Sequence, residues 1–331
     1  GKRVPAKTIW RALKALAEGL GLHATARVFE MDPNPIETWL CQAAEHMEVV
    51  SRYLIHDLQL AQVQVDELWA LLGKQDRAAP SENAKRNRAV RWVWVGVDPV
   101  SKLMLACVVG GRSVETAQLL THLIVGLLAP GCMPLFMSDQ WAPYATALLT
   151  HFGHWVPMPR RHSRGRPPKP RWQPLPGLQY AQVVKHRVKG RVVEVSWRVL
   201  YGSLETIEAI LKQSGVGKVI NTAFIERLNL SIRQGVAALG RKVISLAKTD
   251  DGLRNQLSLW RAYYNFCLPH SALRLLLPEP QPTKGNGSPK KWQQRTPAMA
   301  ANLTDRVWRM EELLLFRVPP WPPAQPAEVA A

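Results

Sequence analysis

The chain has 331 residues and a formal charge of +18, from 43 basic and 25 acidic residues. Such an excess of positive charge indicates a polyanionic partner, either nucleic acid or an anionic membrane surface. A membrane is the weaker alternative, because glycine, proline, threonine and histidine interrupt the most apolar region, 119–137, and leave no apolar span of about 18 residues. The four cysteines form no close pair, which argues against a disulfide framework or a zinc ribbon and suits a reducing cytoplasm.

The first fifty residues have the periodicity of short helices. Leu13, Leu16 and Leu20 follow helical spacing, Gly21 ends this first segment, and residues 23–29 form a second. Pro35 is expected to open a third helix, since proline suits the first helical turn. Two short helices joined by a tight turn predict a DNA-binding helix-turn-helix over residues 1–50, with a plain helical hairpin as the alternative.

The central region alternates strands and helices. Apolar and polar residues alternate over 63–66, which predicts a half-buried strand that delivers Asp66 rigidly. Strands are also expected at 91–98 and 102–109, joined by a short turn, and at 134–138, where a buried strand ends at Asp139. Helices are expected after Ser113, which suits a helix cap, and over 142–152.

Residues 155–200 are rich in basic residues and proline. The run 160–171 cannot form a helix or a central strand, so we expect a loop that follows a nucleic-acid backbone, with a solvated loop as the alternative. A second basic segment, 74–88, is expected to be a turn or hairpin tip. The candidate phosphate contacts in and around these segments are Lys85, Arg86, Arg160, Arg161, Arg164, Arg166, Lys169, Lys185 and Arg187.

Two helices are expected near the C-terminal end of the central region, over 222–238 and 253–267. A linker rich in proline, glycine and lysine follows over 278–289, then a partly ordered element over 298–315 and a disordered tail. Gly1 stands where a complete sequence would begin with methionine, so we expect the N-terminal module to be truncated.

Three acidic residues occupy places that suit one metal site. Asp66 lies on the first central strand, Asp139 ends a later buried strand, and Glu226 lies in the first turns of a helix. Three carboxylates around one point bind two divalent ions, and Mg²⁺ fits because it takes few protein carboxylates. Arg233 is seven residues beyond Glu226 and therefore on the same helix face, where it could hold the strand being cut. Taken singly, each acid could equally be an ordinary surface or helix-terminal residue.

With these contexts the sequence resembles the DDE transposases of bacterial insertion sequences, in the ribonuclease H-like and retroviral-integrase superfamily. Residues 65–69 and 138–144 look like the first two catalytic strands of that family, and 221–229 with Arg233 looks like its catalytic helix. Residues 263–273, which begin Tyr-Tyr-Asn, and 296–300 are similar to segments that follow in such enzymes. The resemblance spans roughly residues 20–315.

The resemblance implies a five-stranded mixed sheet flanked by helices, with an N-terminal helix-turn-helix and a catalytic domain over 60–275. It implies two Mg²⁺ ions, with Mn²⁺ as a substitute, held by Asp66, Asp139 and Glu226. The activity implied is cleavage at inverted-repeat ends and transfer to target DNA, by a homo-oligomer on paired ends in the bacterial cytoplasm, associated with the nucleoid. The spacing of 87 residues between Asp139 and Glu226 (226 − 139) departs from the compact integrase spacing, so about 155–200 would be an insertion.

Other residues are assigned structural roles. Glu67 lies on the strand face opposite Asp66, Asp98 suits a turn, and the tryptophans at 69, 92, 94 and 141 suit a core better than base stacking. The histidines at 162, 186 and 270 could contact phosphate, although a lone histidine is usually structural. Two rival functions stay open: a non-enzymatic DNA-binding protein derived from a transposase, and a ribonuclease H-like nuclease that cuts without joining.

Overall fold

The computed structural model describes residues 4–73, 90–159, 168–241, 243, 245–283, 285 and 287–319. At its centre lies a six-stranded mixed sheet with the order β3-β2-β1-β4-β7-β8. The first three strands in that order are antiparallel, β1, β4 and β7 run parallel, and β8 is antiparallel to β7. The six strands are β1 (Gln62–Leu71), β2 (Val90–Val97), β3 (Met104–Gly110), β4 (Leu135–Asp139), β7 (Gln179–Val188) and β8 (Arg191–Tyr201).

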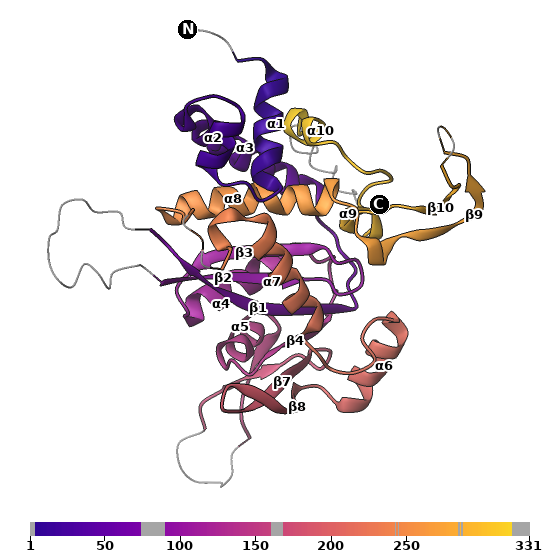
Figure 1. The fold of residues 1–331 in the computed structure, drawn as a ribbon. Helices are drawn as coiled ribbons and strands as arrows, with labels where there is room; N and C mark the ends of the chain where they lie inside the picture. The colour runs from indigo at the N-terminus through magenta and orange to yellow at the C-terminus, as the bar shows by residue number, and fades with distance from the viewer. Residues whose placement is uncertain are drawn as a thin grey trace, which may run out of the picture.

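Helices cover both faces of this sheet (Figure 1). Successive side chains of a strand point to opposite faces, so Val65 packs towards α4 (Val114–Val125) and α5 (Pro143–His151), whereas Leu68 packs towards α7 (Ala223–Gly235) and α8 (Asp250–Ala262). A further helix, α6 (Leu204–Ser214), packs on the sheet at β4 and β7. Six strands between two layers of helices are compatible with the ribonuclease H-like fold implied by the resemblance, with one strand more than the five expected.

The basic region is part of the sheet, which corrects the prediction that all of residues 155–200 form an insertion. Residues 179–183 are buried, since β7 lies between β4 and β8 and is covered on both faces. Among the described strands of this region, β5 (Gly153–Val156) and β6 (Arg171–Pro174) form a short hairpin outside the six-stranded sheet. The predicted loop residues Arg160, Arg161, Arg164 and Arg166, with His162, lie outside the described residues, as do Lys85 and Arg86.

The N-terminal helices are α1 (Ala6–Ala17), α2 (Leu22–Val28) and α3 (Pro33–Leu54). The third helix begins at Pro33 and not at Pro35, because the Asp32 side chain caps it by accepting a hydrogen bond from the Asn34 amide (2.8 Å). It is 22 residues long, much longer than a recognition helix needs, and packs along α8. DNA binding by α2 and α3 stays a prediction.

One hydrophobic core joins the two ends of the described chain. Leu13 and Met47 belong to the same buried cluster as Phe266 and Leu313. After α8 the chain passes through a π-helical turn, Tyr263–Cys267, and reaches α9 (Pro297–Ala300) and α10 (Met310–Leu315). Residues 278–281 of the predicted linker over 278–289 belong to a strand, because β9 (Leu275–Gln281) pairs with β10 (Lys290–Gln293), which begins directly after the linker.

Within the described ranges, no helix combines the length and the apolar character needed to cross a membrane.

Candidate functional site

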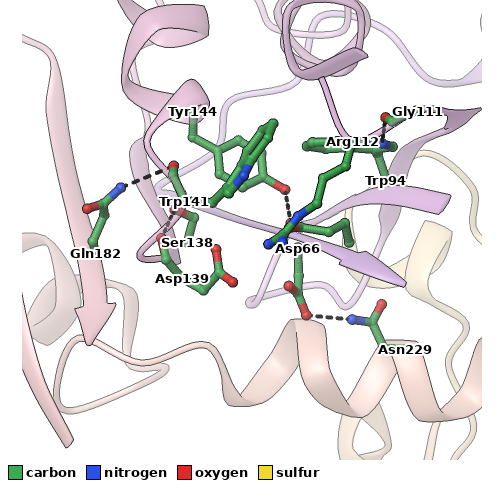
Figure 2. Close-up of polar contacts among 11 residues, drawn as sticks. Asp66, Trp94, Gly111, Arg112, Ser138, Asp139, Trp141, Tyr144, Gln182 and Asn229 are labelled. Carbon is green, nitrogen blue, oxygen red and sulfur yellow. Dashed lines mark hydrogen bonds and ion pairs between the residues drawn. The ribbon is translucent and has the colours of Figure 1, made fainter. Parts of the chain in front are cut away.

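Two of the three predicted acids come together on neighbouring strands. In the parallel pairing of β1 with β4, Gln62 lies beside Leu135 and Gln64 beside Met137, so the same register carried two residues further brings Asp66 beside Asp139. The two carboxyl groups face the same space on the α7 side of the sheet (Figure 2). Asp66, Glu67 and Asp139 each offer an oxygen, and the three oxygens lie within 4.8 Å of one another.

A buried glutamine fixes helix α7 against the strand that carries Asp66. The Gln64 side chain donates to the Asn221 carbonyl oxygen (2.8 Å) and accepts from the Ile225 amide (3.0 Å). One turn further along α7, the Asn229 amide nitrogen donates to Asp66 Oδ2 (2.7 Å; Figure 2). Gln64 and Asn229 were not among the predicted site residues. The signal for Gln64 was a glutamine in a strand whose neighbours Val63 and Val65 are apolar.

Glu226 lies beside this pair but not in the closest group of acids. It is three residues before Asn229 and so on the same face of α7. Its carboxylate forms an ion pair with Lys185 of β7 and accepts a hydrogen bond from the Thr222 hydroxyl (2.8 Å). The third acid in the group of closest oxygens is therefore Glu67, and Glu226 is half-exposed.

Burial and nearby negative charge raise the pKa of both aspartates. The pKa of Asp66 rises to about 7, first because the carboxyl group is buried and next because Asp139 lies beside it. Burial also raises the pKa of Asp139, against the lowering effect of the nearby Arg112 and Lys185 cations. The charge of Glu226 raises the pKa of both aspartates, which places it within electrostatic reach of the pair.

Glu67 is held on the opposite strand face, as predicted from its position next to Asp66. Its side chain is 2% exposed and accepts hydrogen bonds from Arg112 Nε (2.9 Å), Arg112 Nη2 (2.6 Å) and the Tyr144 hydroxyl (3.0 Å). The Arg112 guanidinium also lies 4.8 Å from the ring centre of Trp92 and 5.5 Å from that of Trp141. These contacts make Glu67 and Arg112 a support that joins β1 to the segment after Asp139.

Among the described residues predicted to contact DNA, some make contacts within the protein and others are exposed. Arg233 lies in the last turn of α7, where its guanidinium donates to the carbonyl oxygens of Leu239 (3.1 Å) and Trp69 (3.2 Å) and so fastens this helix end to β1. Lys169 and Arg187 are exposed, and Lys185 is tied to Glu226.

The tryptophans predicted as core residues also differ among themselves. Trp94 is fully buried, but Trp69 is 44% exposed, which corrects its assignment to the core. Trp69 lies on the same face of β1 as Val65, but further along the strand than the helices that cover Val65.

The donor set fits a divalent cation. Asp139 Oδ1 is buried and has no hydrogen-bond partner among the described residues. An unpartnered buried carboxylate oxygen is costly, and a cation beside it would remove that cost together with the repulsion between Asp66 and Asp139. The ligand atoms that converge here among the described residues are carboxylate oxygens, the kind that Mg²⁺ and Mn²⁺ prefer.

No family model and no curated protein matches the chain. Solved structures of the Mos1 transposase match parts of it: a strand transfer complex (14% identity, TM-score 0.18), a mariner paired-end complex with Mn (16%, 0.18) and a pre-cleavage transpososome (15%, 0.19). The matches cover 44%, 46% and 45% of this chain, and 55%, 59% and 59% of the Mos1 chains. The chain therefore spans less than two thirds of the proteins it matches, and TM-scores this low carry no argument about its function.

Proposed function

We propose that this protein is a DNA transposase that cuts phosphodiester bonds at the ends of a mobile element and joins the freed ends to target DNA. The observation that carries the proposal is the pairing of Asp66 and Asp139 on adjacent parallel strands, with an unpartnered oxygen on Asp139 and with α7 bringing Glu226 beside them. The sequence contexts of the same three residues resemble the catalytic segments of DDE transposases.

Asp66, Asp139 and Glu226 would hold the divalent ions. Bound ions would supply positive charge that stabilises the attacking and leaving oxygens during in-line displacement at phosphorus. In the first reaction water attacks, a bond from its oxygen to phosphorus forms, and the bond from phosphorus to the 3′ oxygen breaks, which leaves a 3′-hydroxyl and a 5′-phosphate. In the second reaction that 3′-hydroxyl attacks a phosphodiester of the target and displaces a target 3′-hydroxyl.

The charged side chains of the site determine which ions it attracts. Four acids, Asp66, Glu67, Asp139 and Glu226, meet two cations, Arg112 and Lys185, so the formal balance is −4 + 2 = −2. This excess of negative charge attracts divalent ions and repels a DNA phosphate until they bind. With Glu226 holding a metal ion, Lys185 would be free to contact the phosphodiester backbone.

DNA would approach over the basic parts of the β7–β8 region. Arg187 of β7 is exposed there, Lys169 is exposed just before β6, and the proposal extends to the arginines of 160–166 and to Lys85 and Arg86 as phosphate contacts. Arg233 would act indirectly, by fixing the end of α7. Recognition of inverted repeats by α2 and α3, and assembly of a homo-oligomer on paired ends, belong to the same proposal.

The test is incubation of the purified protein and Mg²⁺ with DNA that carries the flanking ends of its own genomic locus. We expect nicked and joined products from the wild type. Asp66→Asn, Asp139→Asn and Glu226→Gln should each abolish them while leaving DNA binding in EDTA within about twofold. Asp305→Asn and Glu208→Gln, exposed acids outside the site, are matched controls that should keep full activity.

The possible outcomes separate the rival functions and the rival ligands. Full activity in one of the three variants removes that residue from the site. If Glu67→Gln abolishes cleavage and Glu226→Gln does not, the third ligand is Glu67. Nicks without joined products indicate a nuclease, and a wild type that binds but never cuts indicates a non-enzymatic DNA-binding protein.

A further inference from the structure

A pocket of about 410 Å³ lies at the base of the β9–β10 hairpin, outside the group of acids described above. The hairpin projects from the rest of the protein on the side of α9 (Figure 1). His270 and Arg274 line the pocket from the segment before β9, and Lys290, Lys291 and Trp292 line it from β10.

An irregularity in the hairpin brings the cations of β10 to one side. In a regular strand Lys290 and Lys291 would point to opposite faces. The pairing of β10 with β9 shifts register between Lys290 and Trp292, and all three residues line the same pocket. Opposite them the Arg274 guanidinium lies 4.2 Å from the ring centre of Trp292. A guanidinium stacked flat on an indole keeps the N–H groups of its edge available to a phosphate.

The floor of the pocket is fastened to the core. The His270 amide donates to the Arg295 carbonyl oxygen (2.9 Å), and Arg295 Nη2 donates to the Met299 carbonyl oxygen (2.7 Å). Met299 belongs to α9, whose cap Thr296 is fully buried. The segment that carries His270 is therefore anchored at the base of the hairpin, which lowers the entropy lost when the pocket binds a ligand.

The charged residues that line the pocket are all cationic or histidine. No carboxylate in the described part of the chain lies within 4.0 Å of a charged nitrogen of Arg274, Lys290 or Lys291. The pKa of His270 is lowered, first by burial and then by the charges of Lys102 and Arg227, which shows that two more cations face this side. Arg227 directly follows Glu226, so the positive region runs from the pocket to the helix turn that carries the third predicted acid.

We propose that this pocket binds the phosphodiester backbone of duplex DNA next to the place where the acids act. Arg274, Lys290 and Lys291 form ion pairs with successive phosphates, and the hairpin lies along the duplex. A single small anion fits less well, because the cations are spread over β10 and the segment before β9. The assignment of the neighbouring DNA as the cleaved substrate rests on the proposed function, but binding itself does not.

The experiment is a titration of a fluorescent duplex of about 30 base pairs in EDTA at several salt concentrations, with the double variant Lys290→Gln/Lys291→Gln. Both lysines are exposed, so the fold is expected to persist. The affinity should fall roughly tenfold near 0.1 M salt, and the slope of log K against log salt should fall by about two, one for each lost phosphate contact. Arg274→Gln should lower the affinity further, and Arg274→Lys should restore part of it.

The matched control is Lys212→Gln/Lys248→Gln, which removes the same charge from two exposed lysines outside the pocket. It should change the affinity by no more than about twofold. An unchanged affinity in the β10 variant, or an equal loss in both pairs, overturns the proposal. A wild type that binds the duplex but cuts nothing with Mg²⁺ refutes the proposed function and leaves the binding result intact.

Discussion

At the scale of single residues, the clustering of acidic side chains in the candidate site lowers the stability of the metal-free fold. Asp66 is packed against Asp139, with Glu67 and Glu226 adding further negative charge, and its hydrogen bond from Asn229 compensates only part of the repulsion. A raised pKa means that the surroundings of a carboxyl group disfavour its ionised form. Without metal, folding therefore becomes less favourable when these groups ionise.

We predict the pH dependence of the metal-free protein from this residue. In the unfolded chain Asp66 has its ordinary pKa of 3.8, and in the folded protein the value is about 7. Between these two values the folded state binds more protons, so this contribution to stability is complete below about pH 4 and is lost as the pH rises towards 7. Asp66→Asn should remove the loss and raise the free energy of unfolding at pH 8 by about 2–4 kcal/mol.

The measurement is urea unfolding of wild type and Asp66→Asn in EDTA at pH 5 and pH 8. The advantage of the variant should appear at pH 8, shrink at pH 5, and fall again when Mg²⁺ is added, because only the wild type gains stability from the ion. A variant less stable than wild type at pH 8 in EDTA would contradict the account.

Glu67 and Arg112 should respond unequally to substitution. Arg112→Gln leaves a carboxylate that is 2% exposed without its cation and should cost about 2–4 kcal/mol. Glu67→Gln leaves the Arg112 side chain, 42% exposed, which water can solvate, so its cost should be no more than about half as large. Thermal unfolding of both single variants tests this order, and equal losses would mean that the aromatic contacts of Arg112, and not its charge, hold the support together.

At the scale of secondary structure elements, the position of α7 depends on its close contact with α8. Gly235, the last residue of α7, lies against Trp260 of α8, and a Cβ at this glycine would overlap the indole nitrogen. Gly235→Ala should therefore push the two helices apart and cost about 1–3 kcal/mol. Because α7 carries Glu226 and Asn229, Mg²⁺ binding should weaken as well.

Gly111→Ala is the control for this prediction. A Cβ at Gly111 meets no atom within 4 Å, so stability and Mg²⁺ affinity should stay close to wild type. Unfolding and calorimetric Mg²⁺ titration of both variants give the two quantities. A Gly235→Ala protein that binds Mg²⁺ as wild type does would show that α7 reaches its place without this contact.

The elements that could be predicted from sequence are those with strong local patterns. Asp139 at the end of β4 and the span of α7 followed from a short apolar strand and from helical periodicity. The predicted elements do not include helix α6, although Ser203 caps it and Gly215 ends it, because the basic composition before it favours a loop. The linker predicted over 278–289 includes the last residues of β9, because the prolines of this segment suggest irregular chain, although a two-stranded sheet, which has no central strand, tolerates proline.

The arrangement of the acids could be predicted only in part. Asp66 and Asp139 meet because parallel strands place their carboxyl ends at the same edge of the sheet. The ion pair of Glu226 with Lys185 could not be predicted, because Lys185 belongs to a strand whose place in the sheet depends on long-range pairing with β4 and β8. The local sequence pattern also does not tell which of the two consecutive acids, Asp66 or Glu67, faces α7. That depends on which helices cover each face of the strand.

At the scale of the whole molecule, the N-terminal helices are packed as part of the main body. The hydrophobic cluster that contains Leu13 and Met47 also contains Phe266 and Leu313. Polar contacts add to it: Glu48 of α3 accepts hydrogen bonds from the Ser258 hydroxyl (2.6 Å) and from Arg261 Nη2 (2.9 Å) of α8. A DNA-reading function of residues 1–50 would therefore be coupled mechanically to the helix layer that holds α7.

This packing predicts that α3 and α8 unfold together. Glu48→Ala deprives the buried Arg261 of its carboxylate and should lower the opening free energy of both helices by about 1–3 kcal/mol. Glu45→Ala, one turn earlier and exposed, should change it by less than about 0.5 kcal/mol. Native-state hydrogen exchange measures both helices in one experiment. If the amides of α3 open at much lower free energy than those of α8, and Glu48→Ala affects only α3, the N-terminal helices are an independent unit, and the shared core does not couple them to the site.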